Sequence, residues 1–164
     1  MAVRYKLALI LASAIVGLDQ LTKAIITDGM PLWASRPVIP DFFNIVHVLN
    51  RGAAFGFLNR SDIDWQRYLF LGITVLALLV IFSLLKQAQE KERILPIGLG
   101  LIAGGAIGNF IDRISTGAVV DFLDFYVGTY HWPAFNVADI AICVGAGFVA
   151  LATFRSKDNA SDSV

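Results

Sequence analysis

Four long apolar stretches dominate the pattern of hydrophobic and polar positions along this chain. A helix that crosses a membrane needs about 20 mostly apolar residues, because it rises about 1.5 Å per residue. The pattern predicts membrane-spanning helices over about residues 5–26, 68–85, 94–111 and 135–154. We therefore expect an all-α integral membrane protein with four transmembrane helices and a single domain, 1–164, that ends in a polar, disordered tail at 156–164.

The first apolar stretch admits a second interpretation. Its core, residues 7–18, follows Arg4 and Lys6 and contains an Ala-Ser-Ala run, which is also how a cleavable secretory signal looks. Beyond Asp19, however, the chain resumes helical apolar spacing as far as Ile26. This continuation favours a membrane span.

Two longer segments connect the spans on one side of the membrane. Residues 27–67 are too long for a simple connection, and they contain a β-prone run at 42–48 between Pro40 and Gly52. We expect them to form a small β-rich periplasmic element between the first and second helices, resting on the outer membrane surface. Residues 112–134 form the second, shorter outer segment.

The composition agrees with a membrane protein and excludes several other classes. The chain is 57% hydrophobic and only 16% charged, whereas soluble domains carry about 25% charged residues. A net charge of zero gives no reason to expect a nucleic-acid partner. With Cys143 as the single cysteine and only His47 and His131 beside it, no metal-ligand cluster is predicted, and we expect no metal and no cofactor.

Lysine and arginine positions predict the orientation in the membrane, because these residues concentrate in cytoplasmic segments. Seven of the 13 lie in short segments that an even number of spans places on one side, and the other six are spread over much longer stretches. The seven are Arg4, Lys6, Lys86, Lys91, Arg93, Arg155 and Lys157. We therefore expect both termini to be cytoplasmic.

Polar residues inside the apolar stretches are the candidate functional residues, because ionisable groups at membrane depth cost several kcal/mol. Asp19 and Lys23 stand four residues apart, so they can form an intrahelical ion pair or support a site. Asn136 and Asp139 are three residues apart and share a helix face. Asp139 could instead cap a helix that begins at Ala138, but the apolar stretch from there is too short to cross a membrane, which favours a functional carboxylate.

A partner for Asp139 is not fixed by spacing. Asp121 lies between apolar neighbours, but Asp112 and Asp124 are close to it in the sequence. From the residues alone, one or two of these three aspartates are candidates.

Five short motifs, taken in order and at their intervals, resemble bacterial lipoprotein signal peptidase, the signal peptidase II family. The likeness extends from the first predicted span to the fourth. The motifs are Asp-Gln-Leu-Thr-Lys at 19–23, Asn-Arg-Gly-Ala-Ala-Phe at 50–55, Gly-Gly-Ala-Ile-Gly-Asn-Phe-Ile-Asp-Arg at 104–113, Val-Val-Asp-Phe at 119–122 and Phe-Asn-Val-Ala-Asp at 135–139.

The resemblance implies a monomeric aspartyl endopeptidase of the bacterial inner membrane. It would remove the signal peptide from prolipoproteins by cutting before a cysteine that carries a diacylglyceryl group, near the outer leaflet, with membrane lipid as its surroundings. The family's catalytic pair corresponds to Asp121 and Asp139. Matching supporting positions are Asp19, Lys23, Asn50, Gly52, Phe55, Gly104, Asn109, Arg113 and Asn136.

Two other classes remain as alternatives. A small ion-coupled transporter would use intramembrane carboxylates to relay charge, but the sequence shows no repeat and its carboxylates gather toward one side. A membrane-assembly factor would use Gly100, Gly104 and Gly108 only to dock helices.

Overall fold

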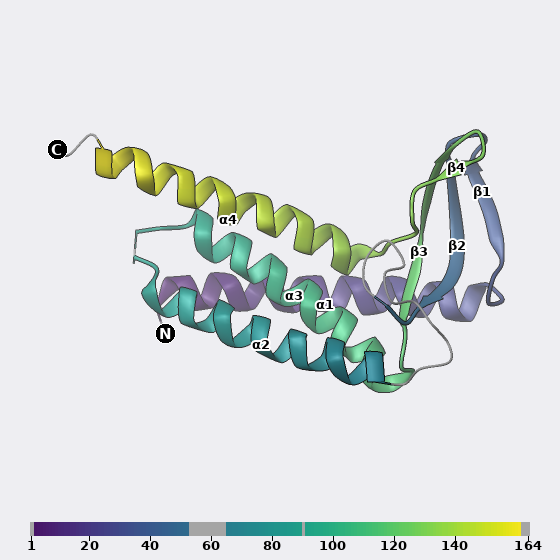
Figure 1. The fold of residues 1–164 in the computed structure, drawn as a ribbon, viewed down its shortest axis with the longest axis horizontal. Helices are drawn as coiled ribbons and strands as arrows, with labels where there is room; N and C mark the ends of the chain where they lie inside the picture. The colour runs from purple at the N-terminus through teal and green to yellow at the C-terminus, as the bar shows by residue number, and fades with distance from the viewer. Residues whose placement is uncertain (1, 53–64, 90, 162–164) are drawn as a thin grey trace.

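The computed structural model describes residues 2–52, 65–89 and 91–161. It contains four helices, each with a stretch long and apolar enough to cross a membrane. They are α1 (Val3–Gly29), α2 (Trp65–Gln87), α3 (Ile94–Ser115) and α4 (Val137–Ser161). α1 begins and α4 ends at the same end of the bundle (Figure 1). The predicted fold class is confirmed, although α4 continues to Ser161, so residues 156–161 of the expected disordered tail are helical.

A small antiparallel sheet stands at the other end of the helices (Figure 1). Its strands follow the order β1 (Ser35–Ile39), β2 (Phe43–Asn50), β3 (Val119–Val127) and β4 (Tyr130–His131). β1 and β2 come from the segment predicted to be β-rich, whereas β3 and β4 come from the outer segment between α3 and α4. Both outer segments therefore build one sheet, and the register places Val48 opposite Asp121.

α3 is the central helix. It packs against all three other helices, and its apolar window is 44% buried, against 17% or less for α1 and α2. Glycines allow this close approach. A Cβ on Gly100 would lie 2.8 Å from the Cα of Ala8 in α1, and a Cβ on Gly145 in α4 would lie 2.6 Å from the carbonyl oxygen of Gly98. The backbones of α1 and α4 are thus fixed against two sides of α3.

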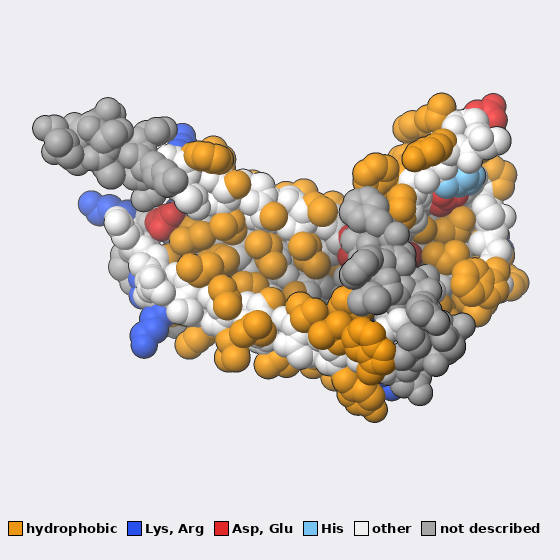
Figure 2. Space-filling model, in the orientation of Figure 1, with side chains coloured by type: hydrophobic (Ala, Val, Ile, Leu, Met, Phe, Trp, Pro, Cys, Tyr) orange, Lys and Arg blue, Asp and Glu red, His pale blue; other side chains and the backbone are white. Residues whose placement is uncertain are grey.

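Hydrophobic side chains cover much of the bundle face that Figure 2 shows, and Lys and Arg gather at the end away from the sheet. Where α1 meets the sheet, a buried apolar cluster joins Ile26 and Met30 to Val120 and Phe122 of β3. The backbone N–H groups of Phe122 and Leu123 also donate to the carbonyl oxygen of Phe135, just before α4. These contacts fix β3 between α1 and the start of α4.

The close packing of α3 on α4 predicts a stability effect. A Cβ on Gly105 would overlap the carbonyl oxygen of Ala138, and overpacking of this kind typically costs about 1–3 kcal/mol. We expect Gly105→Ala to lower the apparent Tm in detergent by several degrees. Gly72→Ala is the control, because a Cβ there meets nothing within 4 Å, and a helical Gly→Ala change stabilises by about 0.5–1 kcal/mol. An unchanged Tm for Gly105→Ala would contradict this account of the α3–α4 contact.

Candidate active site

Asp121 lies on β3 and is 2% exposed. Its two carboxylate oxygens accept hydrogen bonds from two amide side chains. Asn136 Nδ2 donates to Oδ1 at 2.7 Å, and Asn50 Nδ2 donates to Oδ2 at 3.1 Å. The carboxylate is therefore held in one orientation by residues from the start of α4 and the end of β2.

Asp139 lies in the first turn of α4. Asn136 precedes the helix, its Oδ1 accepts the backbone N–H of Asp139 at 3.0 Å, and Asp139 Oδ2 accepts the backbone N–H of Asn136 at 3.3 Å. This reciprocal pair is a capping box, which satisfies two helix N-terminal donors at once. The helix thus begins before Ala138, and Asp139 is not its N-cap residue. Its second oxygen, Oδ1, accepts from Asn109 Nδ2 at 2.9 Å.

Asn136 joins the two carboxylates. It is 0% exposed, its side-chain amide donates to Asp121, and its backbone N–H donates to Asp139. One residue therefore holds a carboxylate from the sheet next to a carboxylate from α4.

Burial raises the pKa of Asp121 to about 7, and the negative charge of Asp139 raises it in the same direction. The hydrogen bonds from Asn50 and Asn136 and the cation of Lys23 act in the opposite direction. Because the pKa of Asp121 lies near neutrality, it and the neighbouring Asp139 can share one proton near neutral pH. One can then act as a general base on water while the other donates a hydrogen bond, which is the arrangement of aspartic peptidases.

Behind the pair lies a second polar cluster, which contains three of the predicted supporting residues, Asp19, Lys23 and Asn109. Lys23 Nζ lies 2.8 Å from oxygens of both Asp19 and Asp112, and it donates to Asn109 Oδ1 at 2.9 Å. The expected intrahelical ion pair between Asp19 and Lys23 is therefore present, but it is part of a larger network. Gln20, which the sequence did not single out although it lies within the first motif, donates to Asp112 Oδ1 at 2.9 Å.

Asn50, Gly52 and Arg113 form a third group beside the pair. Asn50 Oδ1 accepts the backbone N–H of Gly52 at 2.9 Å, and Arg113 Nη2 donates to the carbonyl oxygen of Gly52 at 2.9 Å. The Arg113 guanidinium also lies over the ring of Phe70, 4.9 Å from its centroid. This group holds the end of β2 against α3.

Two other predicted positions remain, Gly104 and Phe55. Gly104 packs against α1, where its Cβ would lie 2.9 Å from the carbonyl oxygen of Ala12, and Phe55 lies outside the described residues. Asp124, the other candidate on β3, accepts from Asn44 Nδ2 at 2.9 Å and lies 2.9 Å from His131 Nδ1. Across residues 2–52, 65–89 and 91–161, no group of three or more His, Cys, Asp or Glu is placed to hold a metal ion.

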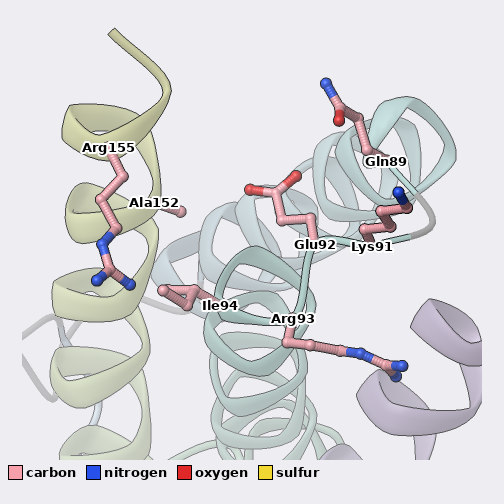
Figure 3. Close-up of a pocket in the computed structure, with 7 residues that line it drawn as sticks. All are labelled: Gln89, Lys91, Glu92, Arg93, Ile94, Ala152 and Arg155. Atoms are coloured by element: carbon pink, nitrogen blue, oxygen red, sulfur yellow. The ribbon is translucent and has the colours of Figure 1, made fainter. Parts of the chain in front are cut away.

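A hollow of about 430 Å³ lies at the opposite end of the bundle (Figure 3). The connection between α2 and α3 lines it on one side, and the later turns of α4 line it on the other. Its charged residues include Lys91, Glu92, Arg93 and Arg155. None of the groups of the aspartate site lines this hollow, so it belongs to the basic end of the molecule.

Four membrane-crossing helices, with a buried and a half-buried aspartate joined by one asparagine, define a polytopic membrane protein of the aspartic peptidase class. The family model described as signal peptidase (SPase) II matches residues 11–155. The chain belongs to the signal peptidase II family, and it is an aspartic peptidase.

Curated relatives and solved structures agree with this assignment. The lipoprotein signal peptidase of Maridesulfovibrio salexigens is 54% identical over 154 residues, which cover 94% of this chain and 99% of the relative. That of Geobacter metallireducens is 42% identical over 160 residues, covering 94% and 98%. A bacterial membrane enzyme solved by the in meso method at 2.3 Å resolution is similar with a TM-score of 0.81 and 35% identity, over 93% of this chain and 90% of that one.

Proposed function

We propose that this protein is an intramembrane endopeptidase that removes the signal peptide from prolipoproteins by cutting before a diacylglyceryl-modified cysteine, with Asp121 and Asp139 as its catalytic pair. The observation that carries the residue assignment is the double contact of Asn136, whose side chain binds Asp121 and whose backbone binds Asp139. Asp19 and Asp112 are also bridged, but by the Lys23 ammonium and the Gln20 amide rather than by an asparagine.

The reaction uses one proton shared by the pair. The ionised carboxylate takes a proton from a water molecule as the water oxygen attacks the scissile carbonyl carbon. The protonated carboxyl donates a hydrogen bond to the carbonyl oxygen, where negative charge develops. When the tetrahedral intermediate collapses, the C–N bond breaks and the leaving nitrogen receives a proton from the pair. The released products are the signal peptide and the lipidated cysteine amine.

Arg113 and Asn50 lie where they can orient the substrate main chain. The Arg113 guanidinium interacts electrostatically with both Asp121 and Asp139, and Asn50 binds Asp121 directly. Both residues carry donors that suit peptide carbonyl groups. We propose that they, with the segment that follows Gly52, hold the peptide beside the pair, and that Phe55 provides apolar contact.

The charge distribution supports a location in the bacterial inner membrane with both termini in the cytoplasm. Lys91, Arg93 and Arg155 lie at the end of the bundle where α1 begins and α4 ends (Figure 3). Because cationic residues favour the cytoplasmic side, the aspartate pair then lies toward the outer leaflet and the sheet on the periplasmic side. We also propose that the protein acts as a monomer.

Cleavage by the purified protein tests the proposed function. Detergent-solubilised protein is incubated with a synthetic lipobox peptide, with and without a diacylglyceryl group on its cysteine. We expect release of the signal peptide from the lipidated peptide only. An ion-coupled transporter or an assembly factor would release nothing, and cleavage of both peptides at equal rates would contradict the lipid requirement.

The pKa of Asp121 predicts the pH dependence. The pair needs one bound proton, and the raised pKa of about 7 means that this proton is lost as the pH rises through neutrality. We expect kcat/KM to fall about tenfold per pH unit at pH values above this pKa, which is the alkaline limb of the pH profile. Asn50→Ala removes a hydrogen bond that favours the ionised form of Asp121, so it should move that limb to higher pH. A limb that stays in place or moves to lower pH would contradict the role given to Asp121.

A further inference from the structure

Lys23 is buried between α1 and α3 and binds three polar groups at once. Its Nζ lies 2.8 Å from Asp19 Oδ2, 2.8 Å from Asp112 Oδ2 and 2.9 Å from Asn109 Oδ1. Lys23 is 3% exposed, and each of its three partners is 8% exposed or less. Such a buried cation is tolerated only when it is fully paired.

The two carboxylates that share Lys23 each bind one backbone N–H next to the catalytic pair. Asp19 Oδ1 accepts the N–H of Ala138 at 3.0 Å, and Asp112 Oδ2 accepts the N–H of Val120 at 3.1 Å. Ala138 and Val120 are the residues that immediately precede the two proposed catalytic aspartates. One ammonium group therefore connects the backbone before one aspartate to the backbone before the other.

Asn109 extends this connection to a catalytic carboxylate. Its Oδ1 accepts from Lys23, so its other amide atom, Nδ2, is the one that faces Asp139 Oδ1 at 2.9 Å. An ammonium group only donates. Lys23 thus determines which end of the Asn109 amide points at Asp139.

We propose that Lys23, acting through Asp19 and Asp112, is a positioning residue that sets the separation and orientation of Asp121 and Asp139 without touching the substrate. The inference rests on the proposed function, because it assigns the pair its role. A pair that shares a proton and a water depends on its geometry, and misplacement by about 1 Å can cost about 10²-fold in rate.

Loss of the Lys23 cation should have an electrostatic consequence as well. The charged groups around Asp121 come from three helices. They are Asp19 and Lys23 of α1, Asp112 and Arg113 of α3, and Asp139 of α4. The cation of Lys23 favours the ionised form of Asp121. Its removal should therefore move the alkaline limb of the pH profile to higher pH, which a purely structural role would not do.

Three variants of the full-length protein, assayed for kcat, KM, pH profile and Tm with the lipidated peptide, test the inference. We expect Lys23→Met to lower kcat about 10²-fold, with KM within threefold of wild type and the alkaline limb shifted upward. Lys23→Met combined with Asp112→Asn should regain about tenfold, because the excess buried negative charge is removed while an oxygen remains for the N–H of Val120. Lys86→Met, at the basic end of α2, is the control and should match wild type.

Several outcomes would overturn the inference. One is a kcat for Lys23→Met within threefold of wild type. Another is a fall in kcat no larger than the fraction of unfolded protein, together with an unchanged pH profile. A third is a rise in KM with no change in kcat. If Lys23→Met does not fold, a folded double variant whose activity stays at the detection limit would also overturn it. If the wild-type protein cleaves nothing, the proposed function fails instead, so the two failures are distinguishable.

Discussion

Replacement of Asp121 or of Asp139 by Asn is expected to lower kcat for cleavage of a lipidated lipobox peptide by at least about 10³-fold, because each change removes an acid–base group worth about 10²–10⁴-fold and the shared proton with it. Asn is nearly isosteric with Asp, so the hydrogen-bond framework around each position can largely remain. Both variants should therefore insert into the membrane and purify with a Tm close to that of wild type.

Asp124→Asn is the matched control for these two variants. Asp124 lies on the same strand as Asp121, is also buried at 7% exposure, and also accepts a hydrogen bond from an asparagine, Asn44. Among the described contacts, however, Asn44 binds no second aspartate, whereas Asn136 binds both Asp121 and Asp139. We expect activity within about threefold of wild type. An inactive Asp124→Asn, or near-normal turnover by either catalytic variant, would mean that the wrong carboxylates have been assigned.

Asn136→Ala is expected to lower kcat about 10²-fold. The change removes the amide that binds Asp121 Oδ1 and the side-chain oxygen that accepts the N–H of Asp139. Loss of such a helix cap costs about 0.5–2 kcal/mol, so the Tm should also fall by a few degrees. Kinetics on the lipidated peptide and thermal unfolding in detergent measure the two effects separately.

Asn44→Ala provides the comparison for Asn136→Ala. It removes a buried asparagine that donates to a buried aspartate on β3, as Asn136 does, but at a distance from the pair along the strand. We expect Asn44→Ala to lower the Tm and to leave kcat unchanged. Equal losses of kcat in the two variants would show that Asn136 supports only the sheet.

The helices were predictable because a bilayer imposes a simple requirement of length and apolar composition on each span. Their ends were less predictable. α4 begins at Val137 because Asn136 and Asp139 form a capping box, whereas the apolar pattern alone extended the span back to residue 135. Its continuation to Ser161 involves polar residues that no hydropathy pattern assigns to a helix.

The strand that carries Asp121 was not predicted, although the β-rich segment before α2 was. Val119–Phe122 are all buried, so β3 lacks the alternation of buried and exposed positions that marks a strand with one solvated face. Its partner β2 lies some 70 residues earlier in the chain, and no local pattern reveals such a pairing. The construction of one sheet from both outer segments thus became apparent only in three dimensions.

The residues alone left Asp112, Asp121 and Asp124 as alternatives, and the resemblance selected Asp121. The structure gives a physical reason that separates the three. Asp112 is bound to Lys23, Asp124 to Asn44, and only Asp121 shares an asparagine with Asp139. Each of these partners comes from a different helix or strand, so spacing in the sequence could not identify them.

The central claim is that Asp121 and Asp139 act as one catalytic unit, and single-turnover cleavage by the double variant tests it most directly. Residues that act as a unit are strongly non-additive. Asp121→Asn, Asp139→Asn and the double variant, each in excess over the lipidated peptide, are predicted to show the same residual rate. A double variant slower than wild type by the product of the two single losses would contradict the claim.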